Sequence, residues 1–129
     1  MEIEKLTIFV RLAQGDPMNE NTATTRTISL NGDWSIANVG AQLQPLANQL
    51  AGLRAAGANV RQVEVNLADI ETIDASGMQL IALFLRHVRM AGVEPVFVNP
   101  THEFLASISL LGFEADFEEL LVDAVRNAA

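Results

Sequence analysis

The chain has 129 residues, a formal net charge of −8 and no cysteine. This length suits a single domain over residues 1–129, and the absence of cysteine excludes disulfides and thiolate metal sites. The acidic balance argues against nucleic-acid binding, and the longest apolar run, which ends at Arg86, is too short for a membrane span. Because the first residues are acidic where a secretion signal is basic, we expect a cytoplasmic protein.

The N-terminal part of the chain predicts two strands joined by a long loop. A run of β-forming residues predicts a strand over 6–12, and alternation of polar with apolar residues predicts another over 25–30. The intervening segment 13–24 contains glycine, proline and two asparagines, which predicts a flexible loop. We expect the two strands to pair antiparallel and Asn31-Gly32-Asp33 to form a turn.

A long amphipathic pattern follows this turn and predicts a helix from 35 to 57. Its apolar positions recur at helical spacing and are Ile36, Val39, Leu43, Leu46, Leu50 and Leu53. Pro45 interrupts the pattern and either kinks this helix or begins a new one, and the sequence leaves both alternatives open. Strict alternation then predicts a strand over 60–67, followed by a short link over 70–74.

The C-terminal half continues to alternate helices with strands. The clearest helix is predicted over 76–91, followed by a strand over 93–98 and helices over 100–112 and 117–128. The inner face of the clearest helix is formed by Gly77, Ile81, Phe84, Leu85 and Val88. The element order predicts an α/β fold with parallel crossovers, a mixed sheet of about four strands, and helices mainly on one face.

No set of residues in the sequence assembles a catalytic site. Ser76 lacks the glycine-flanked setting of a hydrolase nucleophile, because no glycine lies two residues before it. His87 and His102 fall on separate predicted helices, and neither is paired with a second histidine at zinc-binding spacing. We therefore expect no catalytic residue, no metal and no cofactor, with a small hydrolase using Ser76 as a remote alternative.

Acidic residues gather at two places. Asp69, Glu71 and Asp74 lie near one strand end, where a solvated loop is favoured over a cation site. After position 100 the chain has six carboxylates, and Arg126 is its one arginine or lysine. We interpret these carboxylates as a solvated helix face rather than as a surface for a basic partner.

Ser76 lies where a strand and a short acidic turn lead into the clearest helix. Free N–H groups and the positive end of the helix dipole gather at such a start, so a phosphate on Ser76 would find hydrogen-bond donors there. Gly77 removes a side chain beside the hydroxyl, which would allow a kinase to approach. The alternative is that Asp74 and Ser76 are ordinary helix-capping residues.

Four segments in this order resemble the STAS family of stand-alone bacterial anti-sigma-factor antagonists. They are Val65-Asn66-Leu67, Asp74-Ala75-Ser76-Gly77, Val96-Phe97-Val98-Asn99-Pro100 and Leu110-Leu111-Gly112-Phe113. The resemblance runs from about residue 25 to the C-terminus. Ala75 departs from the family, which has a serine there, whereas Ser76 matches the serine that the family phosphorylates.

This resemblance implies a phosphoprotein that regulates transcription by partner switching. Unphosphorylated, it would bind an ATP-dependent serine kinase that doubles as an anti-sigma factor; phosphorylation of Ser76 would block binding, and a phosphatase would restore it. The motif and partner-binding residues would be Asp74, Ala75, Gly77, Met78, Gln79, Leu83, Arg86 and Met90. The alternatives are an accessory subunit of a lipid-transport ABC complex and a chemotaxis-linked signalling adaptor. Homodimerisation is left open.

Overall fold

The computed structural model describes residues 24–128. The predicted strand over 6–12, and all but the last residue of the predicted loop over 13–24, lie outside the described residues. The antiparallel pairing expected of that strand therefore stays a prediction.

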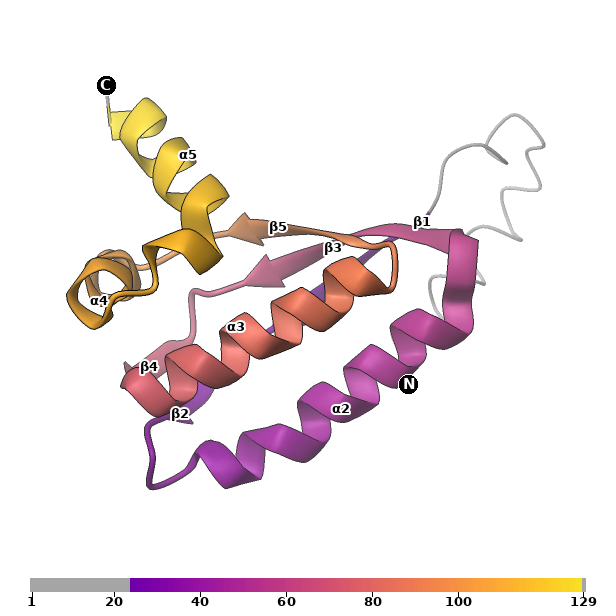
Figure 1. Cartoon of the computed structure of the whole chain (residues 1–129), viewed down its shortest axis with the longest axis horizontal. Coiled ribbons are helices and arrows are strands. Elements are labelled where there is room, and N and C mark those ends of the chain that lie inside the picture. The colour runs from indigo at the N-terminus through magenta and orange to yellow at the C-terminus, as the bar shows by residue number, and fades with distance from the viewer. Residues whose placement is uncertain (1–23, 129) are drawn as a thin grey trace.

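A three-stranded sheet forms the centre of the described structure (Figure 1). It consists of β1 (Thr24–Ser29), β3 (Val60–Asn66) and β5 (Glu94–Val98) in the order β1-β3-β5, and both ladders are parallel. The predicted alternation is present on β3, where Val63 and Val65 are fully buried. Strands joined in this way through helices confirm the predicted α/β fold.

A second ladder continues from the first at the carboxyl ends of β1 and β3. It pairs β2 (Gly32–Trp34) with β4 (Ile70–Ile73), again in parallel, and places Trp34 opposite Ile73. The predictions of a simple turn at 31–33 and an unpaired link at 70–74 are therefore wrong. Strands of three and four residues are too short to show a clear period of two, so only the pairing reveals them.

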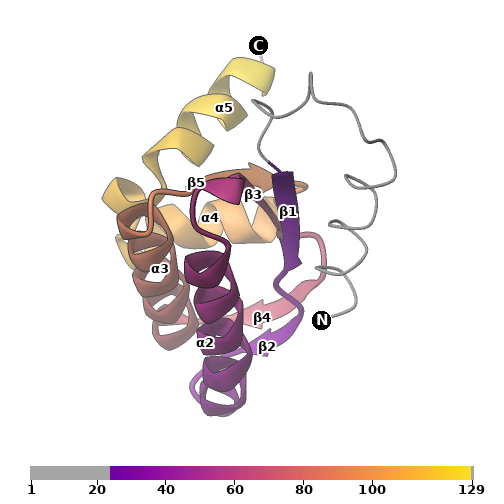
Figure 2. The same ribbon diagram turned by 90° about the vertical axis from the view of Figure 1, so that its right-hand side faces the viewer.

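Helix α2 (Val39–Ala56) runs without interruption through Pro45 and is followed by a short 3-10 turn, η2 (Gly57–Asn59). Of the two alternatives that the sequence left open at Pro45, a new helix is therefore excluded. α2 lies beside α3 (Ala75–Met90), and both lie along the same side of the three-stranded sheet (Figures 1 and 2).

Two of the residues predicted to face inward from α2 are exposed instead. Ile36 is 69% exposed because the helix begins only at Val39, so Ile36 belongs to the preceding turn. Leu43 is 56% exposed, whereas Leu46 is buried. Leu43 precedes Leu46 by three residues, which in an α-helix is a rotation of about 300°. Leu43 therefore lies about 60° around the helix axis from the buried Leu46.

The C-terminal part packs against β4 and β5. It comprises α4 (His102–Leu111), a 3-10 turn η3 (Glu114–Phe117) and α5 (Glu118–Ala128). Phe117 is fully buried, and its ring centroid lies 5.8 Å from that of Phe97 and 5.7 Å from that of Phe104. These ring contacts attach the η3–α5 segment to both β5 and α4.

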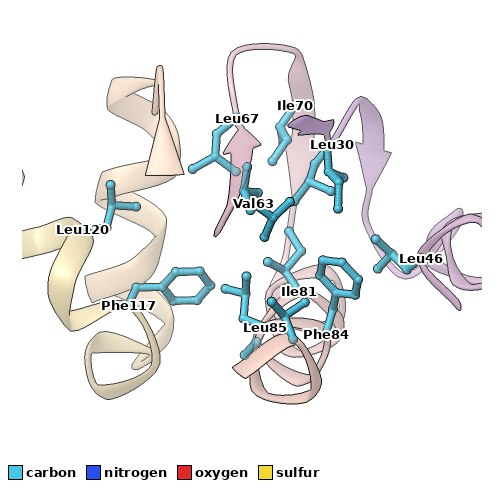
Figure 3. Close-up of a cluster of buried hydrophobic side chains, with 14 of the residues drawn as sticks. Leu30, Leu46, Val63, Leu67, Ile70, Ile81, Phe84, Leu85, Phe117 and Leu120 are labelled. Carbon is cyan, nitrogen blue, oxygen red and sulfur yellow. The ribbon is translucent and has the colours of Figure 1, made fainter. Parts of the chain in front are cut away.

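The hydrophobic core lies between the sheets and the helices (Figure 3). Its largest fully buried side chains are Trp34, Phe104, Phe117, Leu30, Leu53, Leu67, Met78, Ile81, Leu85, Ile108, Val63 and Val65. Within residues 24–128, no helix is both long and apolar enough to cross a membrane.

Candidate functional site

The Asp74 carboxylate joins the starts of two helical segments. Asp74 is the N-cap of α3, and its Oδ1 accepts hydrogen bonds from the backbone N–H groups of Ser76 (2.9 Å) and Gly77 (3.2 Å). Its Oδ2 accepts a third, of 2.8 Å, from the N–H of Ile36 in the turn before α2. One side chain therefore caps α3 and fixes the neighbouring β2–α2 turn.

These hydrogen bonds favour the ionised form of Asp74. The Ile36 N–H contributes most to lowering the pKa of Asp74, the Gly77 and Ser76 N–H groups add to the effect, and partial burial opposes it. The carboxylate is therefore fully charged at neutral pH, directly at the start of the helix that carries Ser76.

Ser76 occupies the second position of α3 and is partly exposed. In the described part of the chain its hydroxyl takes part in no hydrogen bond, so it is available to an external group. The expectation that free N–H donors await a phosphate here is wrong for the Ser76 and Gly77 amides. Both already donate to Asp74, so a phosphate on Ser76 would meet a carboxylate instead.

Gly77 has an internal role rather than an external one. A Cβ atom at this position would lie 1.8 Å from the Trp34 carbonyl oxygen and 2.7 Å from the Trp34 Cβ. Gly77 thus allows α3 to approach the backbone of β2 closely, which corrects the interpretation that it clears space for a kinase. Met78 is fully buried as well, so neither residue contributes to the exposed surface.

The outer face of α3 carries the other residues predicted to bind a partner. Ala75, Gln79 and Arg86 are exposed, and so are two large apolar side chains, Leu83 (44%) and Met90 (72%). Positions 76, 83 and 90 differ by seven residues, which brings them close to one line along the helix. We call Ser76, Leu83 and Met90 the outer stripe.

Tertiary structure adds residues to this region that the sequence analysis did not select. Ile36 reaches the start of α3 through its hydrogen bond to Asp74, and its side chain is exposed. At the other end, Arg86 lies 3.7 Å from Asp116 and Arg89 lies 3.2 Å from Glu119. These partners are distant in the sequence, and no local pattern indicates their proximity.

Within residues 24–128, no group of three His, Asp or Glu side chains is placed to hold a metal ion, including Asp69, Glu71 and Asp74. His87 lies on α3 about three turns beyond Ser76, and His102 opens α4.

Comparison with known proteins places this geometry in a family. A family model described as the STAS domain matches residues 16–128, which is most of the chain. The chain belongs to the STAS domain family. Residues of the motif at the start of α3 and the outer stripe all lie inside the matched range.

Among solved structures, the STAS chain is similar to the anti-sigma factor antagonist SpoIIAA in its unphosphorylated form. The identity is 21% and the TM-score 0.54, over 82% of this chain and 91% of SpoIIAA. At this identity the similarity shows a shared fold. It agrees with the predicted STAS-like α/β architecture.

Two structures of Mglu are also similar to parts of the chain. The first has 28% identity and a TM-score of 0.45 over 59% of this chain; the second, in its native form, has 22% identity and a TM-score of 0.42 over 66%. The chain spans only 17% and 27% of those proteins. A comparison with curated protein sequences gave no significant match.

Proposed function

We propose that this STAS domain is a partner-switching regulator controlled by phosphorylation of Ser76. Unphosphorylated, it binds an ATP-dependent serine kinase that also acts as an anti-sigma factor. Phosphorylation releases the complex, and a phosphatase restores binding. The domain itself performs no reaction, takes no cofactor, and works in the cytoplasm as one unit over residues 1–129.

The observation that carries this proposal is the position of an unengaged hydroxyl at the head of an exposed apolar stripe. Ser76 begins the outer stripe, and Leu83 and Met90 continue it for about four turns of α3. Ile36 adds an exposed apolar side chain beside the same helix start. Apolar surface of this kind is typical of a docking site when it is continuous rather than scattered.

The charge at the start of α3 supplies the switch. Phosphorylation adds a charge of about −1.5 to −2 to Ser76. The neighbouring Asp74 is already ionised, and its carboxylate occupies the nearest backbone donors. The phosphate therefore lacks internal compensation from the Ser76 and Gly77 amides and presents its charge to the docking surface. A partner that accepts the neutral hydroxyl against apolar side chains would be repelled.

The test is to isolate the protein from its native host, identify its bound proteins and map its phosphorylation by mass spectrometry. The proposal expects a serine kinase among the bound proteins, and phosphate on Ser76 after incubation of the pair with ATP. Ser76→Asp should weaken the complex strongly, whereas Ser76→Ala should bind as the native protein does.

Stable binding without any phosphate on Ser76 would contradict the switch. Copurification of an ABC-transporter ATPase or of chemoreceptor signalling proteins in place of a kinase would support the corresponding alternative. Equal binding of the partner by Ser76→Asp and Ser76→Ala would also contradict the switch, provided that both variants have the melting temperature of the native protein.

A further inference from the structure

A hollow of about 370 Å³ lies between β4 and α4 on a part of the surface separate from the outer stripe. Ile70 and Ile73 of β4 and Phe104 of α4 are the large apolar residues of its lining, of which Ile70 and Phe104 are buried, and both elements lie at the same end of the molecule (Figure 1). Thr72 and Ser107 add hydroxyl groups to the lining. The lining therefore combines apolar side chains with polar ones.

One wall of this hollow is formed by strand β4. β4 pairs with β2 in a two-stranded sheet, so in the described residues its opposite edge has no strand partner. In a strand, alternate residues direct their N–H and C=O groups to opposite sides, and half of the β4 backbone groups therefore point away from β2. An extended chain can pair with such an edge through main-chain hydrogen bonds.

The charged residues around the hollow indicate which sign of charge its occupant carries. Glu71 and Glu103 both line it and are exposed, and no lysine, arginine or histidine is among the lining residues. In the described residues neither carboxylate forms an ion pair. Two uncompensated carboxylates favour a cationic occupant and disfavour an anionic one.

The same charges argue against occupants supplied by this chain itself. A second copy carries a net charge of −8. Residues 1–23 contain two basic residues, Lys5 and Arg11, against four acidic ones, and are therefore acidic as well. Both would bring like charge to Glu71 and Glu103, so electrostatics favours a different protein.

We propose that the hollow binds a basic extended segment of a partner protein, which adds as a strand to the free edge of β4. Lysine or arginine side chains of the segment meet Glu71 and Glu103, and alternate apolar side chains enter the hollow over Phe104. This site does not depend on Ser76 or on the outer stripe, so it stands or falls separately from the proposed switch.

The test is a titration of the full chain with a six-residue peptide alternating lysine or arginine with valine, capped at both ends and followed by amide NMR. Shift changes should be confined to residues 70–73 and 101–107. Glu71→Gln combined with Glu103→Gln should lower the affinity about fivefold, as expected for two exposed ion pairs. Glu94→Gln removes one equal charge at the far end of the sheet and should leave the affinity unchanged.

Two further peptides, and one variant whose new side chain fills the hollow, test whether the peptide pairs with β4 as a strand. A peptide with alternate backbone nitrogens methylated cannot complete the ladder and should not bind, and a peptide with glutamate in the basic positions should not bind either. Ser107→Trp fills the hollow and should abolish binding, whereas Leu83→Asp on the outer stripe should not affect it.

Three results would overturn the proposal. The first is equal binding of the methylated or the acidic peptide. The second is shift changes at residues 70–73 upon dilution of the protein alone, which would mean that a second copy occupies the edge. The third is contact of residues 1–23 with Thr72 or Ser107, detected by nuclear Overhauser effects, which would mean that the chain fills its own hollow.

Discussion

The Asp74 carboxylate accepts a 2.8 Å hydrogen bond from the backbone N–H of Ile36, across 38 positions of sequence. The same carboxylate caps α3, so the two helix starts on the proposed docking side are held by one group. As a consequence, the exposed Ile36 side chain is kept beside the helix that carries Ser76. The hydrogen bond therefore links the position of Ile36 to the carboxylate of Asp74.

Asp74→Asn should make the protein less stable at neutral pH, with the loss disappearing in acid. The folded protein lowers the pKa of Asp74 below the unfolded value of about 3.9, chiefly through the Ile36 N–H. This stabilisation is present above the unfolded pKa and is lost as the pH falls through the folded pKa. Melting temperatures of both proteins at pH 7 and through the acid range would measure it.

Asp69→Asn is the matched control for that prediction. Asp69 is exposed and lies in the same acidic segment, but its side chain accepts no hydrogen bond in the described residues. Its melting temperature at pH 7 should equal that of the native protein. A constant difference between Asp74→Asn and the native protein down to the lowest pH would contradict the assigned cause.

Gly77→Ala should destabilise the fold by about 3 kcal/mol, because its Cβ would collide with the Trp34 backbone. Gly40→Ala is the comparison, since Gly40 also lies in a helix but a Cβ there meets nothing within 4 Å. It should stabilise by about 0.5–1 kcal/mol through helix propensity. Urea denaturation gives both free energies of unfolding, and similar effects at the two glycines would refute the close approach of α3 to β2.

Leu83→Asp should weaken binding of the native partner by at least about tenfold while changing stability by less than about 0.5 kcal/mol. Leu83 is 44% exposed on the outer stripe, so a charge there costs little in the free protein but would be buried in the complex. Leu110→Asp supplies the control, because Leu110 is 84% exposed on α4. If Leu110→Asp reduced copurification of the partner as strongly, the outer stripe would not be the docking surface.

Phe117→Ala should cost about 3–5 kcal/mol, since Phe117 is fully buried and its ring packs against Phe97 and Phe104. Val122→Ala in the following helix should cost far less, because Val122 is 47% exposed. The urea concentration at the midpoint of unfolding, measured for both variants, would compare their stabilities. A small effect at Phe117 would show that the η3–α5 segment is not part of the cooperative unit.

Much of this fold was readable from the sequence because its elements are long and periodic. The alternation of Val63, Val65 and Leu67 predicted β3, and the 3.6-residue period predicted α3 with a buried inner face. The end of α4 was readable from Gly112, which adopts the left-handed conformation that favours glycine. The resemblance of the motif segments to the STAS family is confirmed by the family match.

Only the tertiary structure decided what surrounds Ser76. β2 and β4 are too short to have a period and exist because they pair with each other. The sequence placed Asp74 and Gly77 beside Ser76, but it could not show that Ile36 occupies one carboxylate oxygen or that Trp34 fills the space next to the glycine. Local periodicity determines which residues form a helix and which side of it is apolar; contacts between distant segments determine which donors and surfaces remain free.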